Sequence, residues 1–441
     1  MHLLSEQQYH ICVYMHQIML VCHQCSYIEV PTVNGSAGVH YWLVQNSEGL
    51  EDAPTVIWHQ GGPGGSSMIG LMTENGPLTV NDASFKTDAY NKTGIPTVFL
   101  NPYSWHTAPA NVLYVEHPPP TGFSYCVGEC WWNDTSHSVV NYEFLVSFFE
   151  HYPELASNPF FMSGESYAGV LVPTTALQIL RHRTKANKDK APWSLQGWAI
   201  GNACPGNRVF TCTPYSGWIG TQVALDFRFG HGMISEALYA KINKVCEGQW
   251  GTYEAPSKEC ATLLEDPVRP CLSVAGDTYE MGGGYFLYDT CDPDLLAIDP
   301  LTHHPRVQAV NTTNSGHVDT LRVEVTASAK PDYPANSGQY ACGQERGGQA
   351  WLNIEAVREA IHVKTLKQSG RAFHWSTGLN YTLTAYSLLD TYKKILLPAF
   401  RVMQFSGDAD PCVPYVGTQR WITGLGYDTL APWRPWRVGD V

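Results

Sequence analysis

A serine between small residues carries the clearest chemistry in this sequence. Ser166 stands in the hexapeptide 164–169 (GESYAG), after the strand-like residues 160–163 and before the helix-like residues 170–180. A serine at a tight turn from strand to helix is a nucleophile elbow, and small neighbours let the strained turn form and the helix approach the sheet. Ala168 stands where the motif has its second glycine. The pattern predicts that Ser166 is a nucleophile.

A nucleophilic serine needs a histidine base that a carboxylate orients, because its hydroxyl is weakly reactive by itself. In α/β-hydrolases these residues follow in the chain order serine, acid, histidine. Asp408 and Asp410 both come after the strand-like residues 401–405, at a glycine turn. Either aspartate is therefore a candidate for the triad acid.

The developing oxyanion needs two backbone N–H donors. We expect one from Tyr167, which follows the nucleophile, and one from Gly62 in the glycine-rich loop 60–65. This loop is not a phosphate-binding loop, because no Lys-Ser or Lys-Thr pair follows it.

Short apolar runs predict the elements that position these residues. Residues 55–58, 112–115 and 198–200 are typical of buried strands, and the four-residue spacing of apolar side chains over 140–148 predicts a helix. Strands that alternate with helices predict an α/β fold with a mostly parallel sheet and helices on both faces.

Length and charge limit the class of protein. The 441 residues are too many for one compact core, so we expect a main domain with a large insertion, or two domains. A net charge of −13 disfavours nucleic acid and anionic membranes as partners. No apolar run approaches the ~18 residues that cross a membrane. Residues 1–28 are a poorly defined, signal-like segment without a clear cleavage site.

Thirteen cysteines without zinc-site spacing favour disulfides and an oxidising compartment. Cysteine, glycine and proline accumulate over residues 205–335, which predicts a disulfide-tied cap inserted between two core segments, 29–204 and 336–441. Five sequons support passage through the secretory pathway to a vacuole, a lysosome or the outside. Their glycosylation candidates are Asn34, Asn91, Asn133, Asn311 and Asn380.

Several motifs, taken together, resemble the serine carboxypeptidase family. They are residues 58–67 (WHQGGPGGSS), the elbow hexapeptide, and residues 407–410 (GDAD) followed by Val413-Pro414. Shorter matches extend the resemblance over roughly residues 40–441. It implies an α/β-hydrolase fold with a cap insertion. It also implies removal of residues from the C-termini of peptides, usually at acidic pH, without a cofactor or a metal.

The resemblance assigns a substrate-carboxylate site to Trp58, Gln60, Glu74 and Glu165. Two neighbouring carboxyl groups do not both ionise cheaply, so at least one pKa should be raised. A protonated glutamic acid donates a hydrogen bond to a substrate carboxylate, whereas an ionised one repels it. Gln60 stands where the family usually has asparagine, which keeps the amide and lengthens the arm.

The resemblance also favours Asp410 over Asp408 as the acid, and it bears on the cysteines. It implies a cap disulfide between Cys246 and Cys260, and a second cap bridge is nearly matched by Cys271 with Cys291.

The catalytic histidine of the family lies some tens of residues beyond the acid, but His374 is the last histidine of this sequence. We therefore expect the chain as printed to lack the base and the final strands, and to be nearly inactive. His59, His106 and His117 are not expected to replace the base. An acyltransferase on the same scaffold and a non-catalytic carboxylate-binding protein are the alternatives. The preferred substrate residue, the oligomeric state and the cause of the missing histidine stay open.

Overall fold

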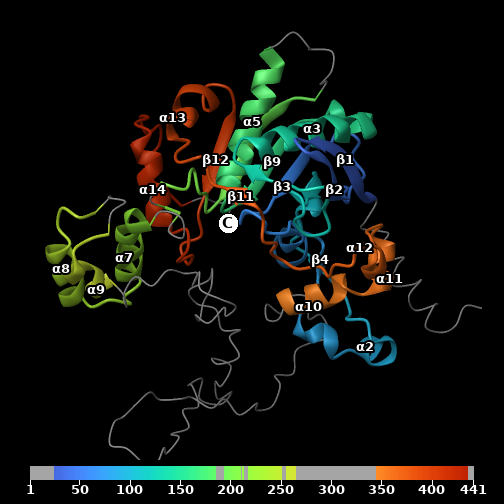
Figure 1. Cartoon of the computed structure of the whole chain (residues 1–441), viewed down its shortest axis with the longest axis horizontal. Coiled ribbons are helices and arrows are strands. Elements are labelled where there is room, and N and C mark those ends of the chain that lie inside the picture. Colours follow the sequence, from blue (N-terminus) through green and yellow to red (C-terminus); the bar gives the residue numbers. More distant parts are fainter. Residues whose placement is uncertain are drawn as a thin grey trace, which may run out of the picture.

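The computed structural model describes residues 24–184, 193–209, 211–212, 217–250, 255–264 and 344–435 (Figure 1). Its centre is an eight-stranded sheet. The strand order is β1 (Gln24–Thr32), β2 (Gly35–Val44), β6 (Asn111–Val115), β3 (Thr55–His59), β9 (Phe160–Glu165), β10 (Leu195–Gly201) and β12 (Arg401–Phe405), with β7 (Tyr125–Val127) also paired to β2.

The five strands from β6 to β12 are parallel, whereas β1, β2 and β7 pair in the antiparallel sense. This arrangement confirms the predicted mostly parallel sheet, and it confirms the strands expected at 55–58, 112–115, 160–163, 198–200 and 401–405. Parallel register brings the carboxyl ends of neighbouring strands together. His59 is level with Gly164, and Gly201 is level with Glu165.

Side chains of the central strands alternate between two cores, one on each face of the sheet. Ile57 and Leu113 belong to the core under α3 (Ser136–His151) and α5 (Ala168–Thr184). Their neighbours Trp58 and Tyr114 belong to the opposite core. The helix expected over 140–148 is α3, whose buried face contains Phe144 and Phe148.

The opposite core is closed by two segments that are far apart in sequence. One is the region of η1 (Gly70–Glu74) and η2 (Asp82–Phe85), and the other begins with α10 (Gln344–Leu352). Both contribute buried side chains, among them Val80 and Trp351.

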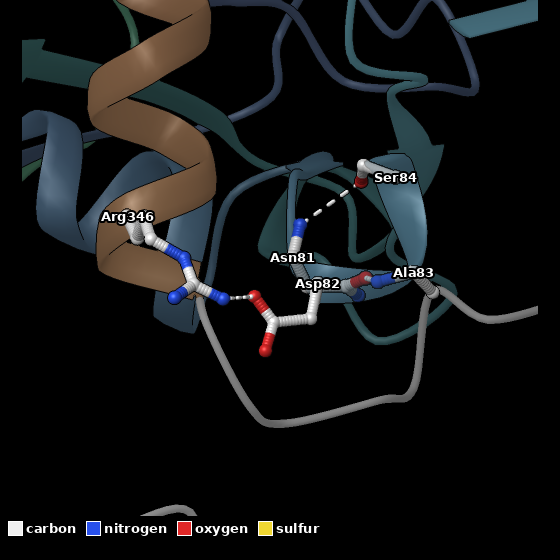
Figure 2. A network of polar contacts seen from close by, with 5 residues as sticks. All are labelled: Asn81, Asp82, Ala83, Ser84 and Arg346. Carbon is white, nitrogen blue, oxygen red and sulfur yellow. Dashed lines mark hydrogen bonds and ion pairs between the residues drawn. The ribbon is translucent and has the colours of Figure 1, made fainter. Parts of the chain in front are cut away.

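An exposed ion pair joins α10 to η2. Arg346 forms an ion pair with Asp82, and Asn81 exchanges hydrogen bonds with the turn that follows it (Figure 2). A Cβ atom on Gly347 would lie 2.9 Å from Val80 O. Only glycine allows α10 to approach so closely.

The remaining elements are short. The strand pairs are β4 (Leu78–Thr79) with β5 (Phe99–Leu100) and β8 (Trp132–Asn133) with β11 (Tyr381–Thr382). The other helices outside the cap are α2 (Asp88–Thr93), η3 (Trp105–Thr107), α4 (Pro153–Ala156), α11 (Glu355–Ala360), α12 (Leu366–Ser369), α13 (Leu389–Thr391), η6 (Tyr392–Leu396) and α14 (Tyr415–Gly424).

The described part of the expected cap is helical and has a small core of its own. It comprises η4 (Gly217–Gly220), α7 (Thr221–Gly230), α8 (Glu236–Val245) and α9 (Lys258–Leu264), which gather beside α14 (Figure 1). A disulfide joins Cys246 to Cys260, as the resemblance implied. Cys271 and Cys291 lie outside the described residues. The domain boundaries themselves stay a prediction, and β1 runs across the expected boundary at residue 28.

Two further disulfides join Cys126 to Cys130 and Cys204 to Cys212. Three of the sequon asparagines, Asn34, Asn91 and Asn380, are exposed, while Asn311 lies outside the described residues. Asn133 is half-buried, and its Oδ1 accepts hydrogen bonds at the start of α3. None of the described helices has the length and apolar character needed to cross a membrane.

Candidate active site

Ser166 lies in the turn between β9 and α5, in the predicted order of strand, serine and helix. Its φ of 58° is in the left-handed region, which is strained for a serine. Hydrogen bonds hold this backbone from both sides: Ser166 N donates to Gly201 O at 3.0 Å, and Ser166 O accepts from Gly169 N and Cys204 N, both at 2.9 Å. The turn is thereby fixed against the neighbouring strand end.

Glycines let the elbow pack against its surroundings. A Cβ atom on Gly61 would lie 2.7 Å from Ser166 Cβ and 2.8 Å from Tyr167 N, so the glycine-rich loop touches the elbow directly. A Cβ atom on Gly164 would lie 2.2 Å from His59 O. Gly62, beside this contact, has a φ of 115° that disfavours other residues. The glycine-rich loop, which carries the expected donor Gly62, is thus packed against the backbone of Tyr167, the other expected donor.

Ser66 and Ser67 anchor the far end of the glycine-rich loop to the end of β6. Ser66 Oγ donates to Glu116 Oε1 at 2.7 Å, and Ser67 Oγ donates to Val115 O at 2.6 Å. Burial raises the pKa of Glu116 to about 8, partly offset by the hydrogen bond from Ser66. Ser66 N also donates to Trp375 O at 2.8 Å. The loop is therefore held from two sides.

The four residues expected to bind a substrate carboxylate form one connected cluster. Trp58 Nε1 donates to Gln60 Oε1 at 2.9 Å. Gln60 Nε2 in turn donates to Glu165 Oε1, and it lies 3.5 Å from Glu74 Oε1. These side chains come from β3, from the loop after it, from η1 and from the end of β9. Glu165 precedes the nucleophile directly, so the cluster adjoins Ser166.

Both acids of this cluster have raised pKa values. Desolvation by the surrounding protein, followed by the charge of Glu165, raises the pKa of Glu74 well above its usual value. Desolvation likewise raises the pKa of Glu165 to about 7, and the nearby Asp410 contributes. Glu74 nevertheless keeps an exposed surface and Glu165 is half-buried. The pair can therefore be protonated in weakly acidic solution and still be reached by a ligand.

The two candidate acids differ in their surroundings. Asp408 is exposed. Asp410 Oδ1 accepts from Cys412 N at 2.7 Å and Val413 N at 3.2 Å, and Oδ2 accepts from Asn202 Nδ2 at 2.9 Å. Burial raises the pKa of Asp410 to about 6 despite these bonds. The fixed carboxyl group favours Asp410 as the acid.

The family model described as serine carboxypeptidase matches residues 16–441. The chain belongs to the serine carboxypeptidase family. It is 30% identical to serine carboxypeptidase-like 21 of Arabidopsis thaliana, with 94% of this chain and 81% of the relative covered. It is 28% identical to serine carboxypeptidase 1 of Hordeum vulgare, covering 94% and 80%.

A solved structure gives the same fold. The prohormone-processing carboxypeptidase Kex1 of Saccharomyces cerevisiae matches with a TM-score of 0.61 at 19% identity, over 91% of this chain and 76% of that chain. The resemblance found in the sequence is therefore confirmed for the family, and with it the general class of hydrolase and the α/β fold.

Asn202, which supports the candidate acid of this serine carboxypeptidase, was not predicted as a site residue. Besides its bond to Asp410, Asn202 Oδ1 accepts from Gly407 N at 2.9 Å, so the side chain braces the whole turn after β12. Its φ of 42° is left-handed, a conformation that asparagine tolerates better than most residues. The Gly-Asn pair at the end of a strand was the available signal, but it does not reveal a partner some two hundred residues away.

Among the described residues, no histidine makes a hydrogen bond to Ser166 or Asp410. The three histidines considered as substitutes have other partners. His59 Nε2 lies 3.2 Å from Asn141 Nδ2, His117 Nε2 lies 3.1 Å from the carbonyl oxygen of His137, and His106 Nδ1 lies 2.7 Å from Ser104 Oγ. That none of the three replaces the base stays a prediction.

Proposed function

We propose that this protein is a serine-type carboxypeptidase that releases the C-terminal residue of peptides through an acyl-enzyme at acidic pH. The observation that carries the proposal is the Trp58–Gln60–Glu74–Glu165 cluster, which adjoins the nucleophile elbow. A pair of acids next to the reacting serine suits recognition of a free carboxylate one residue from the scissile bond.

Recognition of the substrate depends on the protonated state of the cluster. With the pKa of Glu165 raised to about 7, its carboxyl group holds a proton in acidic solution. That proton is donated to the substrate carboxylate, and Trp58 orients the amide of Gln60. Above neutral pH the ionised pair repels the substrate. A C-terminal amide lacks the negative charge and one of the two acceptor oxygens of a carboxylate, so it should bind weakly.

The chemical step follows from the other assigned residues. Ser166 Oγ attacks the carbonyl carbon of the last peptide bond, and the N–H groups of Tyr167 and Gly62 stabilise the resulting oxyanion. Asp410 orients the histidine that takes the proton of Ser166 and returns it to the leaving amine. The 441 printed residues hold no histidine after Asp410.

A binding experiment tests recognition without requiring the base. Calorimetry with the Ser166→Ala variant should give at least about tenfold tighter binding of an N-blocked dipeptide acid than of its amide at pH 5. Glu165→Gln keeps a donor, so it should lose less affinity than the parent protein between pH 5 and pH 8, because only Glu74 can still ionise. Equal binding of acid and amide would contradict the proposed function.

Labelling and product analysis test the reaction. A fluorophosphonate should modify the protein at Ser166, and Ser166→Ala should abolish the modification. Peptide fragments that lose single C-terminal residues support hydrolysis, whereas transfer of the acyl group to an added alcohol, with little free acid, would support the acyltransferase alternative.

We also propose passage through the secretory pathway, to a vacuole, a lysosome or the outside. The Cys126–Cys130, Cys204–Cys212 and Cys246–Cys260 bridges support an oxidising compartment. Glycosidase treatment of the protein from a eukaryotic host should lower its apparent mass. An unchanged mass, together with free thiols at these cysteines, would argue against this route.

A further inference from the structure

Asp134 is a buried carboxylate to which the proposed mechanism gives no role. It is only 2% exposed and stands between β8 and α3. Its Oδ1 accepts from Tyr167 Oη at 2.6 Å and from Tyr381 Oη at 2.8 Å. Its Oδ2 accepts from Ala385 N at 2.6 Å, from Thr384 Oγ1 at 3.2 Å and from Thr384 N. Five donors therefore compensate one buried carboxylate.

One of these donors belongs to the nucleophile elbow. Tyr167 is the residue after Ser166, and its backbone N–H is the assigned oxyanion donor. Its side chain is fully buried, and the ring packs edge-on against Tyr381 at a centroid distance of 6.1 Å. The hydroxyl bond to Asp134 fixes the far end of this side chain. The orientation of the residue is thus set at the backbone and at the hydroxyl.

The donors from Thr384 and Ala385 connect Asp134 to a segment that pairs with Asn207 and Arg208. Ala385 O accepts from Asn207 N at 3.0 Å, and Tyr386 O accepts from Arg208 N at 2.9 Å. Asn207 and Arg208 follow Asn202, whose side chain holds Asp410. The Asp134 carboxylate therefore lies between two backbone segments. One carries Ser166, and the other follows Asn202, whose side chain supports Asp410.

We propose that Asp134 is a positioning residue that, through the hydroxyl of Tyr167, holds the oxyanion-donating N–H of the elbow in place. This inference rests on the proposed function, since it concerns the same oxyanion hole. Ser166 has a left-handed backbone, and the elbow relaxes when an anchor on the next residue is removed. Small displacements of a pre-organised donor reduce the rate strongly, because the donor must face the oxyanion in the transition state.

Two tyrosines provide a matched test. Tyr167→Phe and Tyr381→Phe each remove one hydroxyl donor to the same oxygen, Asp134 Oδ1, and each leaves a ring in place. Burial above all raises the pKa of Tyr381, so its phenol is a donor throughout the working pH range. If Asp134 only stabilises the fold, the two variants should behave alike. If it positions the elbow, only Tyr167→Phe should impair the reaction.

The first measurement is the hydrolysis of an N-blocked dipeptide by the full chain, taken as the rate above the uncatalysed reaction, because no histidine follows Asp410 in the printed sequence. Tyr167→Phe should lower kcat about tenfold with an unchanged KM, because the carboxylate-binding cluster is untouched, while Tyr381→Phe should keep kcat within about twofold. Equal losses of kcat in the two variants, or a change confined to KM, would overturn the proposal.

A second measurement needs no turnover. Gly169 N donates to Ser166 O, and the amides of Val170 and Leu171 donate to Tyr167 O. Hydrogen–deuterium exchange over residues 167–171 should therefore become about tenfold faster in Tyr167→Phe and stay unchanged in Tyr381→Phe. A wild-type chain that binds no peptide acid would refute the proposed function, and the exchange ratio would still decide this inference. Equal exchange in both variants would refute the inference while leaving the proposed function intact.

Discussion

Asn202 combines a side-chain role with an unfavourable backbone conformation, and the two can be separated by substitution. Asn202→Ala removes the bonds to Asp410 and Gly407 and leaves a methyl group at a φ of 42°. Asn202→Gly removes the same bonds but relieves the strain. We expect both variants to lose activity equally, and the glycine variant to be more stable to urea by about 1 kcal/mol. Activity restored by glycine alone would show that the side chain does not support the acid.

The Glu74–Glu165 pair should make substrate binding depend on pH. Because the pKa of Glu165 is raised to about 7, the protonated pair is present at acidic pH and is lost as pH rises through that value. KM, or the Kd of Ser166→Ala for a peptide acid, should therefore rise between about pH 6 and 8 by roughly tenfold for each pH unit above the pKa. A KM that stays flat from about pH 4 to 8 would contradict the assignment.

At the scale of elements, the contact between the glycine-rich loop and the elbow leaves no room for a side chain. Gly61→Ala should abolish labelling of Ser166, because the added Cβ would meet Ser166 Cβ at 2.7 Å and Tyr167 N at 2.8 Å. Gly424 at the end of α14 is the matched control, since a Cβ there meets nothing within 4 Å. Gly424→Ala should leave labelling unchanged and alter the free energy of unfolding by less than about 1 kcal/mol. Equal labelling of both variants would mean that the loop is free to move away from the elbow.

Local sequence patterns predicted those elements that are marked by a continuous run of strand, turn or helix residues. The strand at 160–163, the elbow and the following helix form one continuous signal, and so do the strand at 401–405 and its glycine turn. The hairpin of β1 and β2 was not predicted. Nearly every residue of β2 is buried, so it lacks the alternation of polar and apolar residues that marks a half-exposed strand.

The other contacts that the sequence did not predict join residues far apart in the chain. The family resemblance predicted that Trp58, Gln60, Glu74 and Glu165 act together, and the structure joins them by hydrogen bonds. Asp134 stands inside a sequon, and nothing in its neighbours indicates a partner at the elbow. Such pairs arise from the crossing of chain segments, which periodicity and turn residues do not encode.

At the scale of the whole molecule, four buried histidines make the folded state less stable in acidic solution. Burial lowers the pKa of His40 and His59 to about 3 and that of His137 to about 4, and it holds the pKa of His117 well below 6.5. The unfolded chain therefore binds protons at these positions that the folded chain does not. Their contribution to stability is complete above about pH 6.5 and is lost as pH falls toward 3.

Buried carboxyl groups act in the opposite sense. The pKa values of Glu116, Glu165 and Asp410 are raised to about 8, 7 and 6, first by burial in each case. The folded chain keeps protons here that the unfolded chain releases above about pH 4.5. Folding therefore becomes less favourable as pH rises from that value to the folded pKa values.

The effects of the buried histidines and of the buried carboxyl groups on the free energy of unfolding should nearly cancel between about pH 4.5 and 6.5. We expect the free energy of unfolding, measured with urea from pH 3.5 to 8.5, to be level over that interval and to fall on both sides. Glu116→Gln removes one carboxyl group and should make the alkaline decline shallower without changing the acidic one. Stability that rises steadily toward pH 4 would contradict the balance.

The position of α10 beside η2 also bears on how the protein is made. Tyr114 and Val80 share a core with Trp351 and Phe373, so that core stays open until the later residues have been synthesised. At about 5–20 residues per second, tens of seconds separate the appearance of Tyr114 from that of Trp351 on a ribosome. During this interval the part of this apolar core that α10 covers in the folded protein stays exposed. The nascent chain should then be a client of chaperones that bind exposed apolar segments, until α10 closes the sheet.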